Sequence, residues 1–331
     1  MSDPVYRLEE TEANEKWDEF VLKSPTGTLF SLAAYLSAVG NPVRLFWCLR
    51  GIERRAAVVI NENAAGQAVL DDFVIHNGLI FGPRANKQNR SQTISERFEI
   101  ATDVAAALSQ RYEHLELALS PQVDDIRPFL WHNYGTDGPT YAAEVRYTAY
   151  ADLSGFAEAN APEDIPLFSE ISYARRQEVR KGIKAGIVTA EDMDGAALAA
   201  FYALTMARQG IEVSQEKRDT LQSFTDSLLG KNMARLFVSR TPEGEPAALA
   251  LFGWDNKRAY YLFGAGDPAH RNTPCGTTVL WDAFTALAKD GHALVDLEGV
   301  NSPRRGWFKL SFGAELAPYY QLTKNGKDIP A

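Results

Sequence analysis

The sequence predicts an α/β (α+β) protein with two domains in tandem, each a mixed, mostly antiparallel sheet flanked by helices. Three observations lead to this fold class. The chain has 331 residues, which is too long for one ordinary core and suits two domains of common size. Apolar residues make up 45% and charged residues 23%, as in folded globular proteins. Each half also shows the same order of predicted elements: helices, antiparallel strands, a helix and further strands.

In the first half, apolar spacing predicts helices around Trp17 and Leu32, on either side of a turn at residues 24–27. Alternating apolar residues then predict strands over 44–50, 55–60, 69–75 and 79–81. The next elements are helices over 91–112 and 123–134 and strands over 114–119 and 141–150. We therefore place the first domain at residues 1–151.

The second domain, residues 152–331, begins with Leu153–Phe156, and a long predicted helix over 166–184 follows. A strand at 187–189 follows, then helices over 195–209 and 216–230, and strands over 234–240, 247–254 and 258–264. The predicted order ends with a helix over 276–289 and a strand over 293–297. The two halves share this architecture without a residue-level repeat.

Composition narrows the function classes. A net charge of −9 disfavours a broad phosphate-binding surface. Cys48 and Cys275 are the only cysteines, which suits a reducing compartment. The acidic first residues cannot be a secretory signal, and no apolar run is long enough to cross a bilayer, so we expect a cytoplasmic protein. The five histidines lack metal-ligand spacing, and nucleophile-elbow and P-loop motifs are missing, so we expect no metal or prosthetic group.

Three motifs carry a family resemblance. They are Trp17-Asp18-Glu19-Phe20-Val21 followed by Ser24-Pro25-Thr26-Gly27-Thr28-Leu29-Phe30; Arg175-Arg176-Gln177-Glu178-Val179-Arg180-Lys181-Gly182; and Asp296-Leu297-Glu298-Gly299 followed by Phe308-Lys309-Leu310-Ser311-Phe312-Gly313. In this order, over nearly the whole chain, the sequence resembles tandem GNAT acetyltransferases, and in particular the Fem-type aminoacyltransferases that build peptidoglycan cross-bridges and their acyltransferase relatives. The resemblance implies two GNAT-like domains, one cleft where donor and acceptor meet, and an amide product.

The resemblance places the acyl donor at the loop before residue 276, with Arg271, Thr273, Gly276 and Thr277 as donor-binding residues. The start of a helix offers unpaired N–H groups and a positive dipole end, which suit a pyrophosphate. Acetyltransferases bind coenzyme A here with an Arg/Gln-x-x-Gly-x-Gly/Ala loop, but Pro274 replaces the middle glycine and has no N–H. The alternative is a connection that only shapes the first turn of the helix.

The same resemblance makes Lys309, Glu298 and Asp296 the candidate catalytic residues. Lys309 lies in an apolar stretch read as a strand, where its ammonium would be costly to bury without an anion. The resemblance implies that it stabilises the oxyanion formed when an amine attacks an ester or thioester. We expect one of the two acids to face the cleft and to orient or deprotonate the amine. The alternatives are a solvated or ion-paired lysine and acids that cap or pair with Arg304 and Arg305.

A basic helix face includes Arg176 and Arg180, with Arg175 beside it. The resemblance implies that Arg175, Arg176 and Arg180 hold a nucleotide-diphosphate or lipid-diphosphate group of the acceptor. The alternative is a solvated face with no ligand.

The leading hypothesis is an N-acyltransferase that moves an acyl group from acyl-CoA onto an amine of a cell-envelope or polysaccharide precursor. Peptidoglycan enzymes that use aminoacyl-tRNA commonly carry a coiled-coil arm, whereas residues 184–233 here predict only two helices of ordinary length. An aminoacyl-tRNA donor is therefore disfavoured but stays open. A catalytically silent domain that binds an envelope precursor or a partner protein is the remaining alternative.

Overall fold

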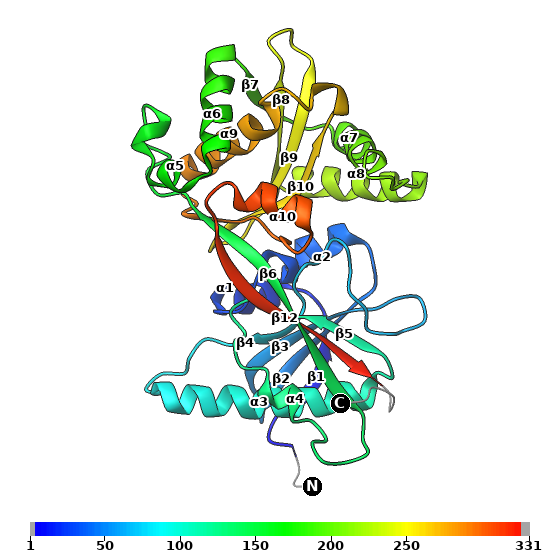
Figure 1. Cartoon of the computed structure of the whole chain (residues 1–331). Helices are drawn as coiled ribbons and strands as arrows, with labels where there is room; N and C mark the ends of the chain where they lie inside the picture. The colour runs from blue at the N-terminus through cyan, green and yellow to red at the C-terminus, as the bar shows by residue number, and fades with distance from the viewer. Residues whose placement is uncertain (1–3, 326–331) are drawn as a thin grey trace. The chain divides into compact units, whose positions relative to one another are not determined.

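The computed structural model describes residues 4–325, which form two compact units. Unit 1 contains the residues up to Arg146 and from Pro318 onwards, and unit 2 contains Tyr147–Ala317. Strands β6 (Thr140–Asp152) and β12 (Glu315–Asn325) contain these boundaries (Figure 1). The domain boundary at Ala151 lies within β6 and stays a prediction.

Unit 1 contains a four-stranded antiparallel sheet in the order β1-β2-β3-β4. Its strands are β1 (Arg7–Thr11), β2 (Val43–Arg50), β3 (Glu53–Asn61) and β4 (Gly78–Phe81), and β5 (Leu115–Ala118) pairs with β12. The helices are α1 (Glu15–Lys23), α2 (Ala33–Val39), α3 (Arg90–Arg111) and α4 (Arg127–Leu130). Helix α3 starts at a capping box formed by Asn89 and Gln92, and its Val104 and Leu108 join a core cluster with Val58 of β3.

Two predicted elements of unit 1 are wrong. Residues 69–75 form no strand, because the Asp71 carboxylate accepts a hydrogen bond from the Phe73 N–H at 2.7 Å and closes a turn. The predicted helix at 123–134 is reduced to the single turn of α4. Strand β1, which pairs antiparallel with β2, was not predicted.

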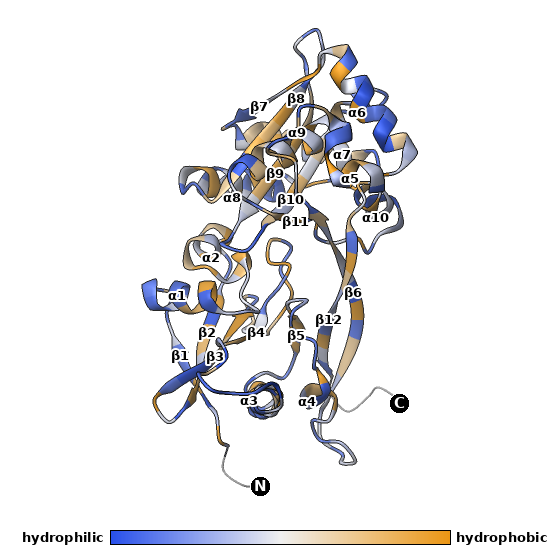
Figure 2. Ribbon diagram, turned by 90° about the vertical axis from the view of Figure 1, so that its left-hand side faces the viewer, coloured by the Kyte–Doolittle hydropathy of each residue, from blue (hydrophilic) through white to orange (hydrophobic). Residues whose placement is uncertain are grey.

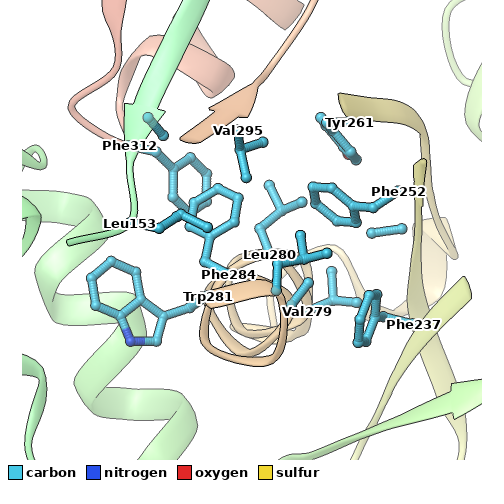
Figure 3. Close-up of a cluster of buried hydrophobic side chains, with 14 of the residues drawn as sticks. Leu153, Phe237, Phe252, Tyr261, Val279, Leu280, Trp281, Phe284, Val295 and Phe312 are labelled. Carbon is cyan, nitrogen blue, oxygen red and sulfur yellow. The ribbon is translucent and has the colours of Figure 1, made fainter. Parts of the chain in front are cut away.

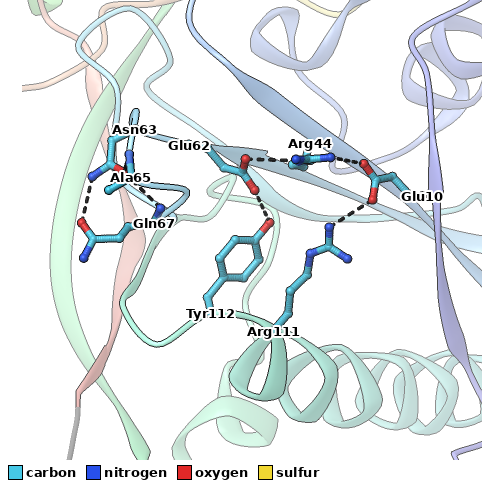
Figure 4. Close-up of polar contacts among 8 residues, drawn as sticks. All are labelled: Glu10, Arg44, Glu62, Asn63, Ala65, Gln67, Arg111 and Tyr112. Atoms are coloured by element: carbon cyan, nitrogen blue, oxygen red, sulfur yellow. Dashed lines mark hydrogen bonds and ion pairs between the residues drawn. The ribbon is translucent and has the colours of Figure 1, made fainter.

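Charged residues on the surface of unit 1 form a paired network (Figure 4). Arg44 lies between two carboxylates, 2.5 Å from Glu10 and 3.1 Å from Glu62. Arg111 binds the other oxygen of Glu10 at 3.0 Å, and the Tyr112 hydroxyl donates to Glu62 at 2.8 Å. The Arg44 hydrogen bond holds the pKa of Glu10 below its usual range. Each charge of this network has an opposite partner.

Unit 2 contains its part of β6 followed by β11, β10, β9, β8 and β7 in spatial order. All neighbours are antiparallel except β10 and β11, which are parallel. The strands are β7 (Val188–Asp192), β8 (Ala234–Arg240), β9 (Pro246–Trp254), β10 (Ala259–Gly266) and β11 (Leu294–Asp296). The helices are α5 (Pro166–Glu170), α6 (Tyr173–Ala185), α7 (Gly195–Ala207), α8 (Gln215–Gly230), α9 (Cys275–Lys289) and α10 (Pro303–Leu310). The predicted α/β fold class is confirmed.

Helix α9 provides the centre of the unit 2 core (Figure 3). Phe284 packs against Phe252 of β9 with ring centroids 6.2 Å apart, and Trp281 packs against Phe156 at 4.8 Å. Figure 2 shows hydrophobic residues along β8 and β9, whereas α6 is largely hydrophilic. Within residues 4–325, no helix combines the length and apolar character that a membrane span requires.

Two predictions for unit 2 need correction. The expected helix at 166–184 is broken into α5 and α6, because the Ser172 hydroxyl caps α6 by accepting from the Arg175 N–H at 3.3 Å. Lys309 lies on helix α10 and not on a strand. Pro303 occupies the first turn of this helix, where its missing N–H costs nothing.

Candidate active site

The parallel strands β10 and β11 separate soon after they meet. They pair only at Ala259 with Val295 and at Tyr260 with Asp296, after which β10 continues along β9 to Gly266. The register of β10 against β9 shifts between Tyr261 and Phe263. A Cβ atom at Gly264 would lie 1.6 Å from the Tyr261 hydroxyl, so only glycine admits this ring. The edge of β10 beyond Tyr260 is therefore not covered by β11.

Two buried carboxylates follow this point of separation. Asp296 and Glu298 are 1% and 3% exposed. One Asp296 oxygen accepts hydrogen bonds from the Thr148 hydroxyl and, at 2.8 Å, from the Glu298 N–H. Glu298 has a φ of 53°, a left-handed conformation that costs about 1–3 kcal/mol for a residue other than glycine. Strained backbone held by such a contact is typical of functional sites.

Lys309 lies beside both carboxylates. Its Nζ is 3.5 Å from the Gly299 carbonyl oxygen and 5.2 Å from the centroid of the Tyr261 ring. Burial lowers the pKa of Lys309 to about 8, although the charges of Glu298 and Asp296 oppose this shift. The charges of both acids thus act on Lys309, although Glu298 lies beyond the end of β11. The expectation that one of the two acids faces the cleft stays a prediction.

Helix α10 can hold Lys309 here because Gly306 has no side chain. A Cβ atom at Gly306 would lie 2.3 Å from the Val300 carbonyl oxygen. Helix α10 thus packs directly on the backbone of the segment after β11, one turn before Lys309. Any larger residue at this position would push the helix away from Gly299.

Glu298 has an incomplete set of hydrogen bonds. Its Oε1 atom is buried and has no partner within residues 4–325. Burial, and then the charge of Asp296, raise the pKa of Glu298 well above its usual value. Burial also raises the pKa of Asp296, against the hydrogen bond from Thr148. An unpaired buried carboxylate is unfavourable, so this oxygen is suited to a proton donor supplied by a ligand.

Sequence reasoning missed the supporting residues Thr148, Tyr261 and Arg258. The Arg258 guanidinium lies 5.0 Å above the Tyr150 ring, and its charge acts on Asp296. Thr148 and Asp296 are 148 positions apart in the sequence. No local pattern in the sequence indicates such contacts, because they arise from strand pairing.

The predicted donor residues lie around the start of α9. Arg271 is exposed, the Thr273 hydroxyl donates to the His270 carbonyl at 2.6 Å, and open space surrounds the position of a Gly276 Cβ. Thr277 points the other way, because its buried hydroxyl contacts Glu178 and Arg175. The start of α9 thus gathers Arg271, Thr273 and Gly276.

The three arginines of α6 all have protein partners. The Arg175 side chain is 12% exposed and binds Glu178 at 2.5 Å, with its guanidinium 4.7 Å above the Phe308 ring. Arg176 donates to the carbonyl oxygens of Ser169 and Ile171. Arg180 forms a solvent-exposed ion pair with Glu163 at 2.8 Å. Arg175 therefore links α6 to α10, and of the three arginines Arg180 is the exposed one.

Comparison with known proteins identifies the domain. Residues 170–305 match the model of the acetyltransferase (GNAT) domain family. The chain carries a GNAT acyltransferase domain. This GNAT domain lies within unit 2 and includes Asp296, Glu298 and the start of α9, while Lys309 follows its end. Within residues 4–325 no cluster of side chains is suited to a metal ion.

Solved structures support a tandem GNAT fold. The crystal structure of FemX matches with a TM-score of 0.63 and 15% identity, covering 94% of this chain and 96% of that one. A tandem GNAT protein from the clavulanic acid biosynthesis pathway matches at 0.56 and 11%, covering 98% and 100%. L-PGS from Bacillus licheniformis matches at 0.52 and 12%, covering 96% and 94%. No curated protein gave a significant sequence match.

Proposed function

We propose that the chain is an N-acyltransferase that moves an acyl group from acyl-CoA onto an amine of a cell-envelope or polysaccharide precursor in the cytoplasm. One observation carries this proposal. The buried Asp296 and Glu298 and the half-buried Lys309 form an incompletely paired charge cluster where β10 and β11 separate, at the end of a GNAT acyltransferase domain. Perturbed charges held at such a point are typical of catalytic sites.

The catalytic roles follow from charge and burial. The neutral amine attacks the thioester carbonyl carbon, a C–N bond forms, and negative charge develops on the carbonyl oxygen. The Lys309 ammonium stabilises this oxyanion in a site of low polarity. Glu298, whose Oε1 has no other partner within the described chain, accepts the amine proton, and Asp296 holds its backbone. The C–S bond then breaks, and the thiolate leaves and takes up a proton.

The donor is proposed to lie between β10 and the start of α9. The open edge of β10 offers backbone groups to the amides of an extended pantetheine arm. Arg271, Thr273 and Gly276 lie near the positive end of α9, which favours the pyrophosphate, and Thr277 positions Arg175. For the acceptor phosphates, the exposed Arg180 and then Arg176 are the proposed contacts, with Arg175 as a positioning residue.

An aminoacyl-tRNA donor is the second candidate, favoured by the fold similarity to FemX. Two features count against it. The region between β7 and β8 contains only α7 and α8, of 13 and 16 residues, and the chain carries a net charge of −9. A catalytically silent binding domain would have no use for the strained and unpaired Glu298.

The experiment incubates the purified protein with acyl-CoA donors or, separately, with aminoacyl-tRNA, together with a panel of amine acceptors, and detects amide and free coenzyme A by mass spectrometry. The proposal predicts equal amounts of both products, unaffected by ribonuclease. Ribonuclease-sensitive product would establish the tRNA donor. Binding of acceptors without product from any donor would establish the silent domain.

A further inference from the structure

A basic pocket in unit 1 lies outside all the residues proposed for catalysis. Its volume is about 340 Å³, and it is lined by Phe81 at the end of β4, by residues on the first turns of α3 and by the loop before α4. The lining residues are Phe81, Arg84, Arg90, Thr93, Ile94, Arg97, Asp124 and Asp125. This volume suits a small ligand.

Two of the three arginines in the pocket come from one face of α3. Arg90, Ile94 and Arg97 follow the spacing of one α3 face, so their side chains lie along the same wall of the pocket. The Arg97 guanidinium rests 5.1 Å from the centroid of the Phe81 ring. Arg84 enters from the segment after β4.

The backbone that carries Arg84 and Arg90 is held in place by hydrogen bonds. The Gln88 side chain accepts from the Ala85 N–H at 3.2 Å and donates to Glu96 at 2.7 Å. The capping box at Asn89 fixes the start of α3. The backbone around the pocket is therefore fixed before any ligand binds, which lowers the entropic cost of binding.

Neighbouring acids do not neutralise these arginines. Glu96 is turned toward Arg55, which binds both of its oxygens at 2.7 and 2.8 Å. Asp125 is bound in the same two-pronged way by Arg127. Within residues 4–325, Arg84, Arg90 and Arg97 form no ion pair, in contrast to the paired arginines of Figure 4.

Asp124 limits the class of ligand. It lines the pocket, is exposed and forms no ion pair within the described chain. A bare anion would be repelled by this carboxylate, whereas a hydroxyl group could donate a hydrogen bond to it. Phe81 and Ile94 offer apolar surface between the charges.

We propose that this pocket binds a phosphate ester of a hydroxylated small molecule, such as a sugar phosphate. The phosphate lies among Arg84, Arg90 and Arg97, where charge-assisted hydrogen bonds are strong, and a hydroxyl lies against Asp124. This site goes beyond the proposed acyl transfer and does not depend on it.

The test is calorimetry of the full chain with glucose 1-phosphate, inorganic phosphate and glucose, and vesicle flotation with phosphatidylcholine, with and without phosphatidylglycerol. Wild type is expected to bind glucose 1-phosphate more tightly than the other two soluble probes. The variant R84Q/R90Q loses charge-assisted hydrogen bonds to the phosphate, so it should bind about 10-fold more weakly or worse. A tenfold change in affinity corresponds to ~1.4 kcal/mol. The variant R7Q/K16Q, which removes two exposed charges of unit 1 outside the pocket, should bind as wild type.

The variant Asp124→Asn separates the two parts of the site. This variant should bind inorganic phosphate more tightly than wild type does. The difference in affinity between glucose 1-phosphate and inorganic phosphate should therefore be smaller. If the protein binds only vesicles that contain phosphatidylglycerol, and R84Q/R90Q abolishes this binding, the pocket still binds a phosphate ester. The ligand is then a lipid headgroup and not a soluble sugar phosphate. An equal loss in R84Q/R90Q and R7Q/K16Q, or no binding of any probe by a folded protein, would overturn the proposal. None of these readouts involves an acyl donor, so they are independent of the proposed enzyme activity.

Discussion

Two groups of charged residues in this chain are built in opposite ways. In unit 1, Glu10, Arg44 and Arg111 lie at the surface and each charge meets its opposite. In unit 2, Glu298 and Lys309 lie among apolar and aromatic groups, the Glu298 backbone is strained, and one of its oxygens has no partner in the described chain. Exposed pairs contribute little to stability and need no further explanation. Burial disfavours charged groups, so they persist in such a place only where the surrounding fold holds them. Because groups with perturbed pKa values cluster at functional sites, we assign catalysis to unit 2.

Of the substitutions that test this difference between the two units, Lys309→Met is expected to have the largest effect, and that effect is on kcat. If the ammonium stabilises charge that develops in the transition state, kcat should fall ~100- to 1,000-fold while KM and the melting temperature are kept. Steady-state kinetics with the identified donor and acceptor, together with thermal unfolding, measure both. Lys289→Met, at an exposed lysine at the end of α9, is the matched control and should behave as wild type. A stably folded Lys309→Met protein with normal kcat would remove Lys309 from the mechanism.

A smaller effect, on stability, is expected from Arg175→Met. This arginine binds Glu178 and the Ser311 hydroxyl and stacks over Phe308, so its loss should lower the free energy of unfolding by ~2–3 kcal/mol. Urea unfolding of Arg175→Met and Arg180→Met would compare the inner and outer arginines of α6. The exposed Arg180 variant should unfold as wild type and instead raise KM for a phosphorylated acceptor. Equal stability of the two variants would contradict the structural role of Arg175.

The smallest effect is expected from Arg44→Met in the network of unit 1. The Arg44 side chain is half exposed and Glu62 keeps its hydrogen bond from Tyr112, so the urea midpoint and kcat should stay close to wild type. A large loss of activity in this variant would contradict the view that the charged residues of unit 1 take no part in catalysis.

Much of the fold could be predicted because periodicity and turn residues are local signals. Helix α3 and strands β8 and β9 lie close to their predicted ranges. Short elements defined by distant partners were missed, such as β1, which is held by pairing with β2, with Arg7 opposite Leu49. In the candidate site, Lys309 and the two acids were named from their motif. Their convergence depends on Thr148 and on the left-handed Glu298, which no local pattern indicates.

The measurement that tests the central claim most directly is the pH dependence of kcat for wild type and Lys309→Arg. Burial lowers the pKa of Lys309 to about 8, so its ammonium is present below this pH and is lost above it. The wild-type kcat should therefore fall as the pH rises through about 8. Arginine stays protonated throughout this range, so in an active Lys309→Arg protein the alkaline fall should move to higher pH. An alkaline fall at the same pH in both proteins would contradict the assignment of Lys309 as the catalytic cation.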